Sequence, residues 1–497
     1  MSGNKCIIIG SGLGGLSSGI ILALNGYDVT VLEQGAQIGG CLQCFTRNGL
    51  NFETGMHFIG SLDEGQSLNR LFRYLGILDK VEFSRLDATG YDIVHLGGGE
   101  YRFANERNPF IGQMSQYFPA RTDDIVRYCN LVDKASRAYS IHSLNLGQSD
   151  SRAVQKYQTH SINEILDSAI SDPLLRDVLV GTIPLYAAVK DKTPFMTHAS
   201  IMDFFNKSAF RTVGGSGKIA SALACRLESL GGRILALKKA RRIVCDETKA
   251  IGVETDSDDF YPADFVISSL HPVATMNLVD SRLIRPVYRE RLSSLPNTSA
   301  PFTVYLSFKE NAMPYCNSNH YCYTSESPWG GEIYDEQTWP KNFMYMHYCH
   351  KDNAKFAKAG EIIAYMSMDE LRQWENSASG HRGDDYIAFK ERKAQKLIMA
   401  ADREFPGLKD AIDRHYTSTP LTYRDFTGTP DGSMYGLIKD VSMGAASHVS
   451  HRTKIPNLLL TGQSINSHGM LGVMISSVVT CSALTGESGI IDQINKE

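Results

Sequence analysis

The stretch from residue 5 to residue 33, KCIIIGSGLGGLSSGIILALNGYDVTVLE, decides the fold of this chain. A short apolar strand runs into Gly10, Gly12 and Gly15, which have the spacing G-x-G-x-x-G. A helix-like run and a second apolar strand follow, and Glu33 ends the unit. Strand, glycines, helix, strand and acid in this order predict a binding site for a dinucleotide.

Each of the three glycines has a physical reason. Gly10 makes the tight turn, Gly12 lets the backbone approach a pyrophosphate, and Gly15 packs the helix closely against the strand. The helix start then directs unpaired N–H groups at the phosphates. Glu33 can accept hydrogen bonds from ribose hydroxyls and repels a 2′-phosphate. The alternative interpretation is an ordinary glycine-rich turn between a strand and a helix.

Further glycines indicate which dinucleotide is bound. Gly19 and Gly26 extend the series, and Gly39 and Gly40 follow the acid. This extension resembles the FAD-binding fingerprint of glutathione-reductase-like flavoproteins, in which a loop after the ribose-binding acid also approaches the extended cofactor. No second G-x-G-x-x-G follows an apolar strand, and Gly97–Gly99 is typical of a hairpin turn. We therefore expect one FAD site and no dedicated nicotinamide domain, with NADPH or NADH as a candidate external electron donor.

Composition limits the classes of protein to consider. The chain has 497 residues, 42% hydrophobic and 21% charged, which is ordinary for a folded protein of two or three domains. A net charge of −4 argues against nucleic acid as a partner. No apolar run approaches the roughly 18 to 20 residues that span a bilayer. Ten scattered cysteines and a first strand at residue 5 predict a cytoplasmic protein with reduced thiols.

Cofactor-type signals occur in three separated blocks. We expect residues 1–62, 212–272 and 455–497 to form one discontinuous FAD-binding domain. The two inserts, 63–211 and 273–454, would then form the substrate-binding region.

The order of these blocks resembles the superfamily of phytoene desaturases, carotenoid isomerases and amine oxidases. Within it, the motifs at 39–45, 49–60 (GLNFETGMHFIG) and 461–463 (TGQ) are similar to retinol saturase, the all-trans-retinol 13,14-reductase-like group. The resemblance implies an α/β fold. It would have a glutathione-reductase-like Rossmann FAD-binding domain of the discontinuous ββα type, with an inserted mixed β-sheet and a helical substrate domain.

The same resemblance implies the cofactor contacts. Those to the pyrophosphate are Gly10, Gly12, Leu13, Gly14 and Gly15. Those to the rest of the FAD are Glu33, Gly40, Cys41, Ala240, Gly462, Gln463, Met470, Leu471 and Gly472. The last three would offer backbone N–H groups at a helix start to the flavin edge that becomes negative on reduction. Gln463 stands where relatives more often carry an acid.

Three side chains are candidate proton donors. Glu53 and His57 lie four residues apart on an apparent strand, so we expect them on one side, and relatives place this strand near the flavin ring. His57 is therefore the preferred donor. His468 precedes the helix expected to cover the flavin, and Tyr435 lies in a glycine-rich segment. A structural histidine or a simple turn is the alternative at each position.

Cysteine spacing leaves one redox alternative open. Cys41 and Cys44 could form a dithiol that passes electrons to flavin, although their place after Gly40 matches a cofactor loop. A zinc site would need a second pair at suitable spacing, and none exists, so we expect no metal.

Aromatic and methionine residues between positions 302 and 368 make an apolar substrate tunnel plausible. The candidates are Tyr305, Phe308, Trp329, Phe343, Tyr345 and Tyr365. The alternative is that they fill the core of a sheet. Alternation at Val304, Leu306 and Phe308 is more typical of a half-buried strand.

These observations predict an FAD-dependent oxidoreductase that acts on carbon–carbon double bonds of a lipophilic polyene or isoprenoid. The resemblance favours a saturase. A desaturase or a redox-neutral cis–trans isomerase would use the same residues, an amine oxidase is a further alternative, and a non-enzymatic flavin carrier stays open. A lipophilic substrate makes peripheral membrane contact reasonable. The substrate itself, the reaction direction, the electron donor and the oligomeric state are not indicated by the sequence.

Overall fold

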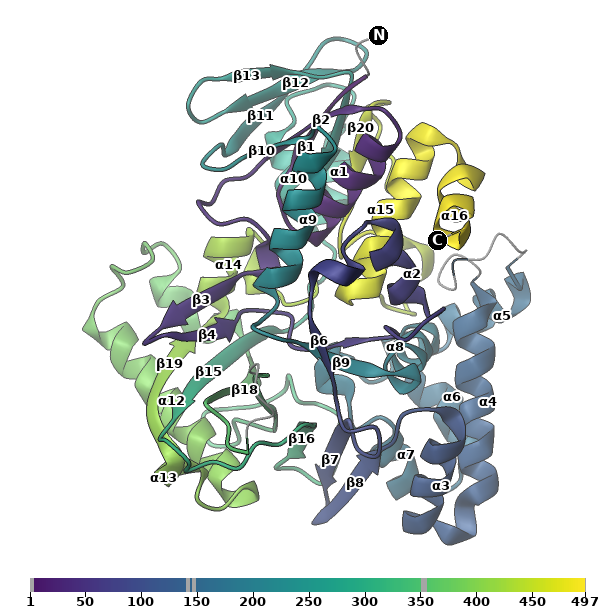
Figure 1. Cartoon of the computed structure of the whole chain (residues 1–497), viewed down its shortest axis with the longest axis vertical. Coiled ribbons are helices and arrows are strands. Elements are labelled where there is room, and N and C mark those ends of the chain that lie inside the picture. The colour runs from purple at the N-terminus through teal and green to yellow at the C-terminus, as the bar shows by residue number, and fades with distance from the viewer. Residues whose placement is uncertain (1–3, 140–143, 145–148, 350–354, 497) are drawn as a thin grey trace.

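The computed structural model of this protein describes residues 4–139, 144, 149–349 and 355–496. Figure 1 shows a parallel sheet with its helices at one end of the molecule, and a larger sheet beside a bundle of helices at the other. Three stretches far apart in the sequence, coloured purple, teal and yellow, meet around the parallel sheet.

The parallel sheet has five strands in the order β10-β2-β1-β14-β20. They are β1 (Lys5–Ile9), β2 (Asp28–Leu32), β10 (Arg233–Leu235), β14 (Phe265–Ser268) and β20 (Leu458–Leu460). Parallel strands are covered on both faces, which explains why β1 and β20 are runs of apolar residues. All four strand pairs are parallel, so the loops after the strands gather at one edge.

Helices α1 (Leu13–Leu24), α9 (Gly217–Ser229) and α15 (Gly469–Thr485) pack with this sheet, α1 against both of the others. Glycine permits the close approach. A Cβ built on Gly14 would lie 3.2 Å from the Cα of Gly462. The loops at the carboxyl edge of the sheet are thereby brought together.

All five strands lie within 1–62, 212–272 and 455–497. One helix outside these ranges, α2 (Ser67–Tyr74), packs on α15 and α16 (Glu487–Lys496). The exact domain boundaries stay a prediction.

Three smaller sheets surround the parallel one. They are β11 (Ala240–Cys245), β12 (Ala250–Thr255) and β13 (Phe260–Pro262); β3 (Cys44–Arg47) and β4 (Leu50–Glu53); and β5 (Ile59–Gly60), β6 (Phe83–Arg85) and β9 (Ala209–Thr212).

The larger sheet has seven strands in the order β19-β15-β18-β17-β16-β7-β8. They are β7 (Asp92–Leu96), β8 (Gly99–Phe103), β15 (Ala300–Phe308), β16 (Asn319–Tyr323), β17 (Asn342–His347), β18 (Ala359–Met366) and β19 (Ile412–Ser418). Only β16 and β7 pair in parallel, so the expected mixed sheet is confirmed. The hairpin expected around Gly97–Gly99 joins β7 to β8.

Helices cover both faces of the larger sheet. On one side lie α3 (Arg107–Tyr117), α4 (Thr122–Ala138), α5 (Ser151–Thr159), α6 (Ile162–Ala169), α7 (Pro173–Leu179) and α8 (Phe195–Lys207). On the other lie α12 (Asp384–Glu404), α13 (Leu408–Ala411) and α14 (Pro420–Thr427). The remaining helices are α10 (Pro272–Leu278) and α11 (Pro286–Ser293). The expected α/β fold, a discontinuous Rossmann-type parallel sheet with an inserted mixed sheet and helices, is confirmed.

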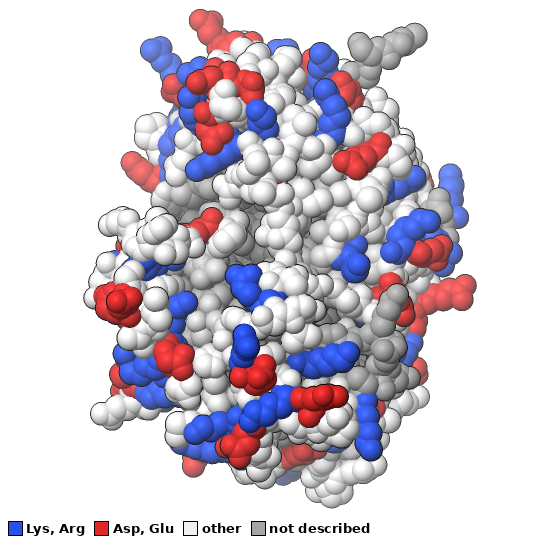
Figure 2. Space-filling view, turned by 60° about the vertical axis from the view of Figure 1, so that its left-hand side comes forward, with Lys and Arg blue, Asp and Glu red and all other residues white. Residues whose placement is uncertain are grey.

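Within the described residues, no helix combines the length and the apolar composition that crossing a bilayer requires. On the face shown in Figure 2, basic and acidic side chains are intermixed.

Candidate active site

A groove of about 350 Å³ runs along the carboxyl edge of the parallel sheet. Its walls come from all three sequence blocks and from α14. The predicted cofactor contacts that line it are Gly10, Gly12, Leu13, Gly14, Glu33, Gly40, Cys41, Ala240, Gly462, Gln463 and Met470. The loops that the sequence assigns to one cofactor thus border one continuous space.

Three predicted contacts lie elsewhere. A Cβ on Gly15 would come within 2.0 Å of the carbonyl oxygen of Gly10, so this glycine serves the close packing of helix and strand. It is not among the residues that border the groove. Leu471 and Gly472 border a second cavity instead.

The part of the groove that Gly12 and Gly40 border lies at the start of α1, and we call it the neck. Gly12 caps this helix without any side-chain hydrogen bond, and a Cβ built on it would meet no atom within 4 Å. A Cβ on Gly40 would lie only 3.1 Å from the Cα of Gly12, so the two loops approach closely. The start of α1 therefore has no side-chain cap and has open space in front of it, so its backbone N–H groups could bind a pyrophosphate.

Glu33 lies at one end of the groove and is 8% exposed. Its Oε2 accepts hydrogen bonds from the backbone N–H (3.0 Å) and the hydroxyl (2.6 Å) of Ser11, and its Oε1 accepts one from the N–H of Gly35 (2.7 Å). These bonds fix the carboxylate beside the groove, where a ribose hydroxyl could donate to it. Ala240 borders the same end.

The other end of the groove meets the start of α15. His468 caps this helix without a side-chain hydrogen bond, and Gly469 and Met470 line the groove directly after it. The groove thus combines a fixed acid, glycines at one helix start and a second helix start, which suit the ribose, the pyrophosphate and the flavin edge of FAD. The residues present therefore fit this cofactor.

A second cavity, of about 300 Å³, continues from the groove. Seven residues border both spaces: Gly55, Met56, Tyr423, Met434, Tyr435, Gly469 and Met470. Beyond this junction most of the walls are apolar, with Phe58, Phe204, Met344, Met346 and Ile363 among them. Arg70, Arg137 and Lys207 lie at a polar end.

The aromatic candidates for a substrate tunnel do not border this cavity. Side chains alternate along β17, so Met344 and Met346 face the cavity while Phe343 and Tyr345 pack in the core toward α12. Tyr305, Phe308, Trp329 and Tyr365 do not border the cavity either. The half-buried strand expected around Val304 is also wrong, because β15 is buried along its whole length.

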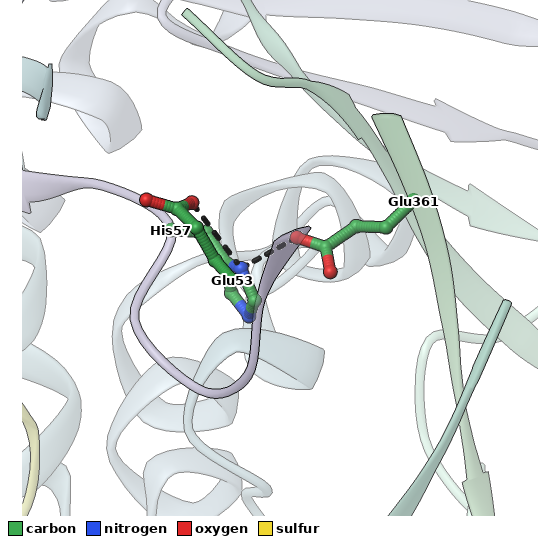
Figure 3. Close-up of side chains that lie close together, drawn as sticks. All are labelled: Glu53, His57 and Glu361. Carbon is green, nitrogen blue, oxygen red and sulfur yellow. Dashed lines mark ion pairs between the residues drawn. The ribbon is translucent and has the colours of Figure 1, made fainter. Parts of the chain in front are cut away.

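Two carboxylates hold His57 beside the junction (Figure 3). Its Nδ1 lies 2.5 Å from Oε1 of Glu361 on β18 and 3.7 Å from Oε2 of Glu53 at the end of β4. The second oxygen of Glu361 accepts a hydrogen bond from the hydroxyl of Tyr348 (2.9 Å). Two ligands of one zinc ion, each at about 2.0–2.2 Å, would lie farther apart than 2.5 Å, so this contact is a direct ion pair.

The charges around His57 set its protonation. Burial alone would lower its pKa, but Glu361 and then Glu53 outweigh burial and raise the pKa to about 9. Burial also raises the pKa of Glu53. At neutral pH His57 is therefore a partly buried imidazolium.

His57 does not lie on a strand, contrary to the expectation. β4 ends at Glu53, and the chain turns back through a loop before β5 begins at Ile59. The loop, rather than strand alternation, brings His57 back to Glu53.

The other two candidates pack against each other in the same cavity. The rings of Tyr435 and His468 lie 4.8 Å apart at 34°. Burial, followed by the charge of Lys439, lowers the pKa of His468 to about 4. Burial raises the pKa of Tyr435. At neutral pH both side chains are uncharged.

Cys41 and Cys44 are free thiols with different surroundings. Cys41 borders the groove, and burial raises its pKa to about 11. The sulfur of Cys44 instead accepts the backbone N–H of Gly217 (3.3 Å) at the start of α9. Cys41 therefore borders the groove, whereas the sulfur of Cys44 is bonded to the start of α9.

Sequence reasoning missed Glu361, Tyr423 and Met434. Glu361 is wholly buried in the otherwise apolar β18 (AGEIIAYM), and this lone acid in an apolar strand was the available signal. The hydroxyl of Tyr423 donates to the carbonyl of Thr54, beside the junction. Nothing in its local sequence distinguishes it.

Comparisons with known proteins agree with this geometry. Rat all-trans-retinol 13,14-reductase is 24% identical over 96% of this chain and 85% of its own. Prolycopene isomerase 1 of an Oncidium hybrid cultivar is 25% identical over 97% and 84%. The solved structure of an oxidoreductase from Methanosarcina mazei has the same fold, with a TM-score of 0.63, 16% identity, and coverage of 96% of this chain and 99% of that one.

The model of the family "flavin containing amine oxidoreductase" matches residues 13–478. This range includes the α1 end of the groove, the His57 cluster and most of α15. The chain therefore belongs to the flavin-containing amine oxidoreductases and is an FAD-dependent oxidoreductase.

Proposed function

We propose that this protein reduces a carbon–carbon double bond of a lipophilic polyene or isoprenoid, as a saturase. The observation that carries the proposal is the partly buried imidazolium of His57 on the wall of an apolar cavity that opens into the FAD groove. The names of the relatives, a retinol reductase and a prolycopene isomerase, support this substrate class.

We assign FAD to the groove, with Glu33 at the adenosine ribose, the glycines of the neck at the pyrophosphate, and the start of α15 at the flavin. When bound, FAD supplies the hydride. The apolar walls, including Met344 and Ile363, hold the substrate and exclude water from the junction. NADPH or NADH as the electron donor, and peripheral contact with a membrane, remain part of the proposal.

His57 supplies the proton. Its Nδ1 is held by Glu361, and the other ring nitrogen points away from both carboxylates (Figure 3). A charged imidazole donates a proton and does not accept one, so the cluster favours reduction of a double bond over its formation. His468, neutral at pH 7, is the weaker donor.

The test uses protein reconstituted with FAD and reduced with dithionite without oxygen. All-trans-retinol and prolycopene are added in turn, and the products are separated and weighed by mass spectrometry. A gain of two hydrogens supports a saturase. An unchanged mass with altered double-bond geometry identifies an isomerase, and a loss of two hydrogens with oxidised FAD identifies a desaturase. No conversion of either polyene in either flavin state would overturn the proposal.

A second candidate, amine oxidation, is favoured by one observation. Tyr423 and Tyr435 both border the junction, where two aromatic rings could flank an amine. Lys439, a basic group near this site, donates to the carbonyls of Ser464 and Ile465 and borders neither cavity. Peroxide release from putrescine by the oxidised enzyme in air would support this candidate instead.

A further inference from the structure

A third cavity, of about 220 Å³, lies on the far side of His57 and is polar. At its rim Gly49, Asn51 and Lys358 are exposed, while Glu53 and Thr212 in its wall are buried. It therefore leads from the surface of the protein to the carboxylate of Glu53.

Two orphaned groups indicate that water occupies this cavity. Nε of Arg211 and Oγ1 of Thr212 are buried and have no hydrogen-bond partner among the described residues. Both residues border the cavity. Buried polar groups of this kind are normally satisfied by ordered water, and the volume is sufficient for several molecules.

His57 is the one described residue that borders both this polar cavity and the apolar cavity. The groups that stabilise the positive charge of His57 are also connected to the polar cavity. Glu53 borders the polar cavity, and so does Tyr348, whose hydroxyl donates to Glu361. Glu361 itself is wholly buried and borders none of the three cavities.

We propose that the polar cavity is the proton-entry route of the enzyme, and that His57 carries protons from its water to the apolar cavity. This inference rests on the proposed function only for the last step. In that step a ring N–H bond of His57 breaks and a C–H bond forms on the substrate. In the reloading step a hydronium ion in the polar cavity loses a proton to the neutral imidazole of His57 and becomes water, which restores the imidazolium.

Separate entrances for the substrate and for protons have a chemical advantage. A lipophilic substrate needs a dry cavity, and water at the junction would compete with it for the proton of His57. A proton can reach His57 from the polar side without any water in the apolar cavity. Glu53, a carboxylate on the water side, attracts the incoming cation.

The experiment measures proton exchange between His57 and solvent in the oxidised FAD-loaded protein without substrate. The protein is labelled with ¹⁵N-histidine, and the ring N–H signal of His57 is assigned by its loss in His57→Gln. Asn51→Trp closes the rim of the polar cavity, and Lys358→Trp does so from β18's side. We expect each to slow exchange roughly tenfold or more, because exchange then requires a local opening.

Arg137→Trp is the matched control, since it places the same indole at the polar end of the apolar cavity. We expect it to leave the exchange rate of His57 unchanged. Slower exchange in Arg137→Trp alone would show that protons enter through the apolar cavity and would overturn the inference. Unchanged exchange in both rim variants would also overturn it. Because no substrate is present, either result stands whether or not a polyene is reduced.

Discussion

His57 and His468 border the same cavity but carry different charges at neutral pH. Glu361 and Glu53 stand behind His57 and raise its pKa to about 9. Behind His468 the nearby charge is Lys439, and burial together with this cation lowers its pKa to about 4. The wall at His57 thus carries a proton donor at neutral pH, and the wall at His468 carries a neutral imidazole.

This difference shows that a histidine in an apolar cavity is an acid only if carboxylates compensate its burial. The imidazole is the same in both places, so the neighbours determine its role. A substrate protonated by His57 would receive its proton on the face of the double bond that is turned toward His57.

The largest effect is expected from removing the acid. His57→Gln should lower the rate of polyene reduction by about 10²–10⁴-fold, the usual contribution of general acid catalysis, with FAD binding retained. Stopped-flow absorbance of the reduced enzyme with all-trans-retinol measures this. The matched variant His468→Gln should lower this rate far less. Equal losses of rate in the two variants would show that the two histidines do not differ as proton donors.

The same cluster should make stability depend on pH. The pKa of His57 is raised from 6.5 to about 9, so its stabilisation is complete below pH 6.5 and is lost as the pH rises through 9. The loss amounts to about 3 kcal/mol for one buried group. Urea unfolding of the wild type and of His57→Gln at pH 6 and pH 10 isolates this contribution. A difference between the two proteins that stays constant with pH would contradict the assigned charge.

Glu33 tests whether cofactor retention and proton donation are separable. Glu33→Arg should weaken FAD binding by about 10–100-fold, the value of a hydrogen bond to a charged group. The variant Glu33→Gln, which keeps an acceptor for Ser11, should lose less. Fluorescence of released flavin reports both affinities. At saturating FAD, the pH profile of turnover should match the wild type, because Glu33 borders the groove and not the cavity that His57 borders. Retained affinity in Glu33→Arg would contradict the ribose assignment.

The smallest effect concerns the apolar wall of the same cavity. Met344→Phe should raise KM for a long polyene several-fold, because Met344 faces the cavity, with kcat little changed. Tyr345→Phe, one residue on, should leave KM unchanged because Tyr345 packs in the opposite core. Steady-state kinetics of the two variants compares the two faces of β17. The reverse order of effects would mean that the strand presents its other face.

The groove was predictable because its chemistry is local. The turn at Gly10, the helix start after Gly12 and the acid at Glu33 are set by a few neighbouring residues, and repeated glycines mark the approach to the cofactor. The five-stranded sheet followed from the same blocks.

The cavity wall was not predictable in the same way. Which of Phe343 and Met344 faces the substrate depends on strand register and on the helix that covers the other face, and neither leaves a local mark. His57 was chosen by resemblance, but its charge comes from Glu361, some 300 residues away. Glu361 pairs with Tyr305 and Met346 only once the larger sheet has formed.

The order of strands in the parallel sheet has a consequence for biosynthesis. β1 lies in the middle of the sheet, and its second neighbour, β14, begins at Phe265, while the edge strand β20 begins at Leu458. At roughly 5–20 residues per second, a ribosome needs roughly 20 to 90 s to travel from the first strand to the last. During that time α1 lacks α15, one of the helices that it packs against, so nascent chains should depend on chaperones until the C-terminal block emerges. The groove that we assign to FAD is complete only after that block has folded, because residues 461–464 and Gly469, Met470 and Val473 form part of its wall.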